Sequence, residues 1–137
     1  QGELLAELRN RLPTLQIANG RTVIQQEYQK TLQNHGIRRR PDLIIHEPYD
    51  PEHHSNRREG NHAVFELKLC CTPKKAKDDF DCLSQIMAAL NYPLAFFINI
   101  NSFRTQFAHL PVNFPGRLVA FSVKLKDGNV VIREEST

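Results

Sequence analysis

Three charged residues stand where apolar residues would be expected. Asp42 opens the short apolar run DLIIH, while Glu66 and Lys68 interrupt a second run, AVFELKL. Because side chains alternate along a strand, Glu66 and Lys68 should share one face of it. A buried charge is costly unless it is paired or binds a metal, so packing alone does not favour these residues. They therefore indicate either metal and acid–base chemistry or, in the simpler alternative, a structural Glu–Lys pair at an edge strand.

The elements before these residues can be read from periodicity and from turn residues. Leucines at helical spacing before Pro13 predict an amphipathic helix over residues 3–12. Residues 22–32 are ambiguous and are interpreted as a strand, with a turn at 34–36 and an antiparallel partner strand at 41–46. Residues 47–61 contain two prolines and almost nothing apolar, which predicts a long, exposed and mobile loop.

The second half of the chain alternates strands with one long helix. A strand is expected at 63–70, and Thr72-Pro73 offers an N-cap and a first turn to a helix over about 74–91. The apolar run LAFFINI, 94–100, is typical of a strand covered on both faces. Residues 126–129, KDGN, predict a hairpin between strands 117–125 and 129–134. The expected class is α/β.

Pro41-Asp42 at the start of one strand and Glu66-x-Lys68 on the next strand resemble the PD-(D/E)XK nuclease superfamily, which has the restriction-endonuclease-like fold. That fold has a mixed central sheet flanked by helices in the order α-β-β-β-α-β, the order expected here. The resemblance covers roughly residues 3–100, and the C-terminal β-hairpin would be a peripheral addition. It implies one nuclease-like domain spanning residues 1–137.

The resemblance implies a Mg²⁺-dependent nuclease that hydrolyses phosphodiester bonds, with DNA favoured over RNA. Asp42 and Glu66 would bind Mg²⁺, for which Mn²⁺ can substitute, and the Leu67 carbonyl would be a further ligand. Lys68 would orient or deprotonate the attacking water and stabilise the transition state. Nearby carboxylates and metal act on the pKa of Lys68 in opposite directions, so the sequence does not assign its protonation state.

Members of this superfamily often carry another acid upstream. Glu27 is the leading candidate for this catalytic carboxylate, and Glu7 and Glu3 on the first helix are alternatives. Some members also use a glutamine in the later helix. Gln85 fits that position in the sequence, but helical geometry places it nearly opposite the apolar stripe, which favours an exposed glutamine. His46 would share a strand face with Asp42, although a histidine at a strand end is more often simply hydrogen-bonded.

Basic clusters flank the two motif strands and are the expected phosphate contacts. They are Arg38, Arg39 and Arg40 before the first strand, and Lys74, Lys75 and Lys77 after the second. The 47–61 loop lies between the motif halves and is the expected place for substrate selection. Asp50, Glu52, His53 and His54 in that loop look metal-like, but adjacent residues in a flexible loop are expected to be solvated and to lack convergent geometry.

Composition limits the other classes. The chain has 137 residues with a net charge of +3, which suits one globular domain. No apolar run is long enough to cross a bilayer, and three cysteines without framework spacing suit a reducing, intracellular compartment, cytoplasmic or nuclear. A start at Gln1 predicts a processed product or a fragment of a longer protein. The sequence leaves open whether the domain acts alone, as a homodimer, or with further domains or partner subunits.

Two other functions remain at this level. The first is a catalytically silent restriction-endonuclease-like domain that serves as a nucleic-acid-binding or assembly module. The second is an unrelated small α/β interaction domain in which the motif is accidental. The intact set of Asp42, Glu66 and Lys68 argues against the silent module, because a domain freed from catalysis has no physical reason to keep a buried charged triad.

Overall fold

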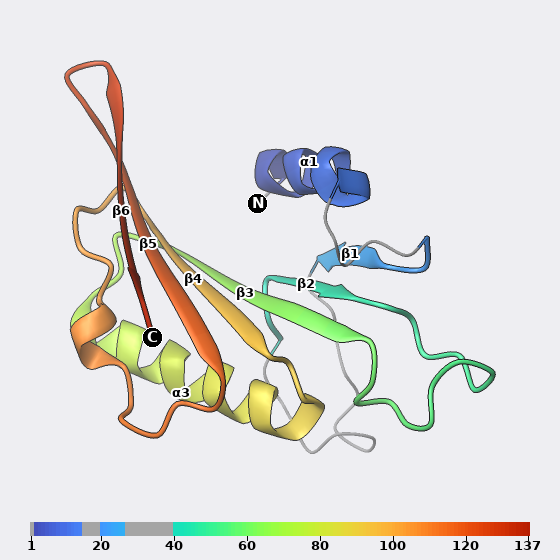
Figure 1. Ribbon diagram of the computed structural model, residues 1–137. Coiled ribbons are helices and arrows are strands. Elements are labelled where there is room, and N and C mark those ends of the chain that lie inside the picture. The colour runs from blue at the N-terminus through green and yellow to red at the C-terminus, as the bar shows by residue number, and fades with distance from the viewer. Residues whose placement is uncertain (1, 15–19, 27–39) are drawn as a thin grey trace.

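The computed structural model describes residues 2–14, 20–26 and 40–137. These residues form a six-stranded mixed sheet, with the long helix α3 across one face and the short helix α1 near one end of the other (Figure 1). The α/β class is thereby confirmed. The elements are α1 (Gly2–Arg11), η1 (Leu12–Thr14), β1 (Val23–Gln26), β2 (Leu43–His46), β3 (Asn61–Leu69), α3 (Pro73–Leu90), β4 (Leu94–Ile100), η2 (Phe107–His109), β5 (Arg117–Lys126) and β6 (Asn129–Ser136).

The strands lie in the sheet in the same order as in the chain. β1, β2 and β3 are antiparallel neighbours, β3, β4 and β5 run parallel, and β6 returns antiparallel to β5. α3 is the crossover between the parallel strands β3 and β4. The observed boundaries agree with the predicted ones to within two residues for most elements. β1 is described only to Gln26, so the rest of the predicted strand and its turn lie outside the described residues.

α3 begins and packs as the sequence predicts. The Thr72 hydroxyl accepts a hydrogen bond from the Lys75 amide, and Pro73 occupies the first turn, where its missing N–H costs nothing. Every third or fourth residue of α3 then faces the sheet, and these side chains form one core with alternate residues of β2 to β5. That core includes Ile44, Val64, Ala76, Phe80, Leu83, Ile86, Met87, Leu90, Ala95, Phe97, Leu118 and Ala120.

The opposite face of the sheet is only partly covered. α1 packs through Leu5 against Ile24 and Ile45, near β1 and β2. The prediction that β4 is covered on both faces is wrong, because its burial alternates and Phe96 and Ile98 are only half-buried. They line an apolar cavity of about 680 Å³ together with residues of β3 and β5. A continuous apolar run therefore does not show which faces of a strand are covered.

The C-terminal hairpin is part of the main sheet, because β5 pairs along its length with β4. Asp127 and Gly128 at its tip both have positive φ, 50° and 77°, as a type I′ turn requires. The three cysteines are free thiols. No helix in the described ranges combines the length and apolar character needed to cross a bilayer.

Candidate active site

β2 and β3 bring the two halves of the motif together. Leu43 pairs with Phe65, so Asp42, just before β2, lies beside Glu66. The Asp42 amide donates to the Phe65 carbonyl at 3.1 Å, and its side-chain Oδ2 accepts from the Leu67 amide at 2.7 Å. The Asp42 carboxylate thus accepts a hydrogen bond that a backbone carbonyl would accept if β2 began earlier. The sequence prediction that Asp42 meets the Glu-x-Lys strand agrees with this geometry.

Glu66 and Lys68 project from β3 on the face that α3 covers. Val64 is on this face in the α3 core, whereas Phe65 and Leu67 pack on the α1 side, so the predicted alternation is confirmed. Glu66 is 8% exposed, and its Oε1 accepts a hydrogen bond from the Lys68 ammonium. Because the N–H and C=O of one strand residue point the same way, the Leu67 carbonyl faces the Asp42 side, where β2 has ended.

α3 supplies a third carboxylate, Asp79, which the sequence reasoning missed. Its Oδ1 lies 3.5 Å from the Lys68 Nζ. Asp79 follows Ala76 by three residues and precedes Leu83 by four, so it occupies a position of the buried stripe. The sequence did contain a signal for this residue, namely a carboxylate at a helix position where the pattern calls for an apolar side chain. Asp81, two residues on, is exposed.

The charges at this point do not balance. Among the described residues, three carboxylates, those of Asp42, Glu66 and Asp79, lie around the Lys68 ammonium. Burial raises the pKa of Glu66 to about 7; the hydrogen bond and charge of Lys68 oppose this rise, and the Asp42 and Asp79 charges add to it. For Lys68, burial disfavours the charged form, but its hydrogen bond to Glu66 and the three carboxylate charges together raise its pKa. The site accordingly has excess negative charge and an ammonium that stays protonated.

The available donor set suits a hard divalent cation. Three carboxylates and a backbone carbonyl are all oxygen ligands, which Mg²⁺ and Mn²⁺ prefer, and no sulfur or imidazole ligand is needed. Asp42, Glu66 and the Leu67 carbonyl would hold the ion. Asp79 contacts Lys68, and through this lysine it would help to orient the waters bound to the ion. A cation here would offset the like-charge repulsion that raises the Glu66 pKa.

The basic residues assigned to phosphate binding are only partly placed. Lys75 lines a cavity of about 380 Å³ together with Lys68, Asp78 and Asp79, so it stands beside the carboxylates. Lys74 and Lys77 are exposed on the first turns of α3, and Arg40 is exposed before Asp42. Arg38 and Arg39 lie outside the described residues, as does Glu27, the leading candidate for the additional acid.

The alternative candidates for the extra acid are not brought to the site. Glu3 and Glu7 are exposed on α1, which packs on the face opposite Glu66, and Glu7 pairs with Arg11 at 2.5 Å. His46 contacts the Gln25 side chain on β1 at 2.6 Å, an ordinary strand-end interaction. Gln85 is exposed, as its helical position predicted.

A second buried carboxylate, Glu47, changes the description of the loop that follows β2. Its side chain lies 3.2 Å from the Arg21 Nε, 3.4 Å from the His54 Nε2 and 3.6 Å from the His62 Nε2. The His54 Nδ1 accepts from the Asp50 amide, so its Nε2 carries the ring proton and faces Glu47. The expectation of a wholly exposed loop is therefore wrong, since Glu47, His54 and Asn61 are buried.

Gly60 closes this loop over Glu47. Its φ is +74°, and an added Cβ would stand 2.9 Å from the His54 Nε2, so glycine is required there. The exposed tip of the loop brings ligand atoms of Asp50, Glu52 and His53 within 4.8 Å of one another, closer than the sequence reasoning expected. All three are surface or near-surface groups, and their proximity alone does not define a metal site.

Comparisons with known proteins give no match, whether the chain is compared with family models, curated proteins or solved structures. The resemblance to PD-(D/E)XK nucleases therefore depends on the motif residues and their setting. A functional argument must come from the site, meaning its groups, their distances and their charges.

Proposed function

We propose that this domain is a Mg²⁺-dependent nuclease with a restriction-endonuclease-like fold that hydrolyses phosphodiester bonds, DNA in preference to RNA. The observation that carries the proposal is the meeting of Asp42, Glu66 and Lys68 at one point on one face of the sheet. The excess of carboxylates there supports a cation ligand. The preference for DNA comes from the family resemblance.

Each residue then has a role that its position permits. Asp42 and Glu66 hold the cation, which supplies Lewis-acid charge neutralisation and a water of lowered pKa. Lys68, protonated and hydrogen-bonded to Glu66, orients the attacking water and donates to the phosphoryl oxygen as negative charge develops. Asp79 positions the Lys68 ammonium from α3. Lys75, at the cavity next to Lys68, contacts the scissile strand.

Matched variants on the same elements test this assignment. Glu66→Gln and Glu47→Gln remove the charge of two equally buried glutamates. Asp79→Asn and Asp81→Asn make the corresponding change on α3, the first at the position that faces Lys68 and the second at an exposed position. Each protein is incubated with supercoiled, linear and single-stranded DNA and with RNA, in Mn²⁺ and in EDTA. Wild type, Asp81→Asn and the folded fraction of Glu47→Gln are expected to cut only with metal.

Glu66→Gln is expected to abolish cutting, and Asp79→Asn to reduce it. A wild type that binds these substrates but cuts none of them would contradict the proposal and favour the silent binding module. Equal activity of Glu66→Gln and wild type would remove Glu66 from the metal site. Chromatography and melting curves for every variant separate loss of chemistry from loss of fold.

A further inference from the structure

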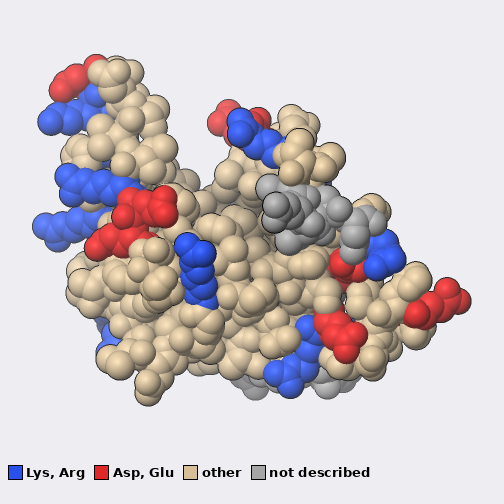
Figure 2. Space-filling model, viewed as in Figure 1, with Lys and Arg blue, Asp and Glu red and all other residues tan. Residues whose placement is uncertain are grey.

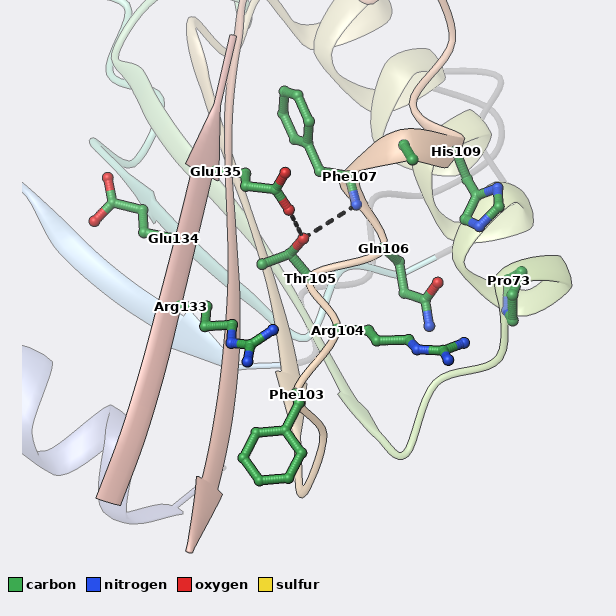
Figure 3. Close-up of a pocket in the computed structure, with 11 residues that line it drawn as sticks. Pro73, Phe103, Arg104, Thr105, Gln106, Phe107, His109, Arg133, Glu134 and Glu135 are labelled. Atoms are coloured by element: carbon green, nitrogen blue, oxygen red, sulfur yellow. Dashed lines mark hydrogen bonds between the residues drawn. The ribbon is translucent and has the colours of Figure 1, made fainter. Parts of the chain in front are cut away.

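A second hollow lies at the far side of the same sheet face. It has a volume of about 480 Å³, within the range of small-ligand pockets, and is formed by the segment after β4, η2 and strand β6. Figure 3 shows Arg133 projecting from β6 towards the segment that carries Phe103 to Phe107, whereas Glu134 projects from the other side of β6. None of its lining residues belongs to the carboxylate site.

Buried amides fix the segment that carries this pocket. The Asn99 side chain, fully buried, accepts from the Cys71 amide and donates to the Arg104 carbonyl, each at 2.8 Å. The Gln106 side chain donates to the Cys71 carbonyl at 2.8 Å, and Gln106 holds a left-handed backbone with φ of 64°. A non-glycine residue in that conformation persists only when its surroundings impose it. The pocket is therefore preorganised and tied to the end of β3.

The pocket is lined by two guanidinium groups, those of Arg104 and Arg133, and by two carboxylates, those of Glu134 and Glu135. Within the described ranges, neither the Arg104 nor the Arg133 guanidinium forms an ion pair. Glu135, the lining carboxylate on the same side of β6 as Arg133, accepts a hydrogen bond from the buried Thr105 hydroxyl. Glu135 keeps its charge in this hydrogen bond, but neither guanidinium is tied to it in an ion pair, so both can still donate to an anion, and guanidinium geometry matches phosphate oxygens.

An aromatic ring stands beside these cations. Phe103 has the Arg133 Cζ 5.6 Å and the Lys124 Nζ 4.8 Å from its ring centroid. Lys126 adds a further cation towards the hairpin tip, and Figure 2 shows basic side chains along this hairpin with acidic ones between them. Both cations lie over the ring, so they form cation–π contacts with it in the free protein. Aromatic rings together with cations also bind single-stranded nucleic acid, where bases stack on the ring and phosphates pair with the cations, so a bound strand would exchange these contacts for a base and a phosphate.

The sheet register aligns this pocket with the carboxylate site. One row of paired residues crosses four strands on this face, namely Lys68, Asn99, Ser122 and Arg133. Three strand spacings of about 4.8 Å place Arg133 roughly 14 Å from Lys68. At about 3.4 Å per nucleotide along a strand in duplex geometry, this is some four nucleotides, and fewer for an extended strand. Asn99 and Ser122 are buried, so a strand passing over the surface needs at least this length to reach both places.

We propose that this pocket binds an unpaired segment of the substrate strand, with Arg104 and Arg133 on a backbone phosphate and Phe103 against a base. That the strand is a nuclease substrate rests on the proposed function. The binding itself does not, because it needs neither metal nor cleavage. The pocket would hold the strand a few nucleotides from the scissile phosphate and favour single-stranded over fully paired substrates.

Fluorescence anisotropy in EDTA tests the binding without chemistry. Labelled single-stranded and duplex oligonucleotides of equal length are titrated with wild type, Arg104→Ala, Arg133→Ala, the double variant, Phe103→Leu and Arg117→Ala. Arg117 is a matched control, since it is an exposed arginine at the opposite end of β5. Within the described part of the chain, Arg104 forms hydrogen bonds through its backbone carbonyl and amide and not through its side chain, so the variant should fold.

The double variant should bind single strands on the order of tenfold more weakly, with the slope of log affinity against log salt reduced by about 0.7 for each lost phosphate contact. Phe103→Leu should weaken single-strand binding more than duplex binding. Arg117→Ala should match wild type. Affinity of the double variant equal to that of Arg117→Ala would overturn the proposal.

Competition distinguishes a strand from a free ligand. Inorganic phosphate and a nucleoside monophosphate should displace the oligonucleotide only at concentrations far above its own Kd, because each offers a single contact. Displacement by the monophosphate at an equal Kd would make this a free-nucleotide pocket and overturn strand binding. Arg104-dependent binding together with absent cleavage in Mn²⁺ would reject the nuclease function while leaving this inference intact.

Discussion

Glu47 and Glu66 are both only 8% exposed and lie on adjacent parts of the same sheet, yet their surroundings are opposite. Around Glu47 stand an arginine and two histidines, and the loop closes over it. Around Glu66 stand two further carboxylates and one lysine. Burial of a carboxylate is thus a poor guide to function. Among the described residues, what distinguishes the two positions is the kind of neighbour: an arginine and two imidazoles surround Glu47, whereas further carboxylates surround Glu66.

The largest expected difference between the two regions is in cleavage. Lys68→Ala removes the ammonium that contacts Glu66 and Asp79 without removing a cation ligand. Cleavage should fall by on the order of 10²-fold or more, the scale of losing a positioned electrostatic or acid–base group. Substrate affinity should change far less. Arg117→Ala, at an exposed position away from both sites, is the control, and undiminished cutting by Lys68→Ala would exclude the proposed role of Lys68.

The next effect is a pH dependence of stability that arises at Glu66. Its pKa is about 7 in the folded protein against 4.5 for the ordinary group, so the folded state binds more protons between these values. Protonated Glu66 contributes roughly 3 kcal/mol to the free energy of unfolding. This contribution is complete below about pH 4.5 and is lost as the pH rises towards 7. Denaturant unfolding of wild type and Glu66→Gln should therefore diverge between pH 4.5 and 7. Parallel pH profiles would contradict the raised pKa.

Removing the charge of Glu47 should change the free energy of unfolding in the opposite direction to removing the charge of Glu66. Glu47→Gln removes the charge that accepts the Arg21 hydrogen bond and lies beside His54 and His62, at a cost of about 2 kcal/mol, the scale of a hydrogen bond to a charged group. Glu66→Gln at pH 8 should cost less than this or stabilise the fold, because it removes a poorly compensated charge. Urea melts of both variants measure the contrast. Equal losses would mean that burial, and not charge balance, sets the difference.

A smaller effect is expected from metal alone. At ten times its Kd, Mg²⁺ or Mn²⁺ should stabilise the wild type by about 1.4 kcal/mol, since it binds the native state preferentially. Asp42→Asn should lose this rise in melting temperature, whereas Asp81→Asn should keep it. A thermal-shift titration decides the matter. Identical responses of wild type and Asp42→Asn would remove Asp42 from the cation site.

The smallest effect concerns the basic residues at the start of α3. Lys74→Ala and Lys75→Ala should each weaken nucleic-acid binding slightly and reduce the salt slope by about 0.9 on duplex DNA if each neutralises one phosphate. Lys75, beside Lys68, should matter more than Lys74. Sequence preference should not change. Nucleic-acid binding that does not vary with salt would mean that these lysines do not contact phosphates.

Local patterns predicted much of this molecule. The bounds of β4 match the predicted 94–100, and the alternation that puts Glu66 and Lys68 on one face follows from strand geometry. The features that escaped prediction depend on which elements meet. Asp79 matters because α3 crosses β3, and Phe96 is half-exposed because no described helix covers that part of the sheet. Likewise, His54 is buried only because Gly60 brings the loop back to Glu47.

The agreement between strand order and chain order has a consequence for how the protein is made. A sheet of this kind can grow by adding each new strand to its outer edge, without threading the chain between strands already in place. Asp42, Glu66, Lys68 and Asp79 all come from a short central stretch that leaves the ribosome before β5 and β6. During synthesis we therefore expect the carboxylate site to assemble first, and the arginine pocket to be completed only when the last strand is added.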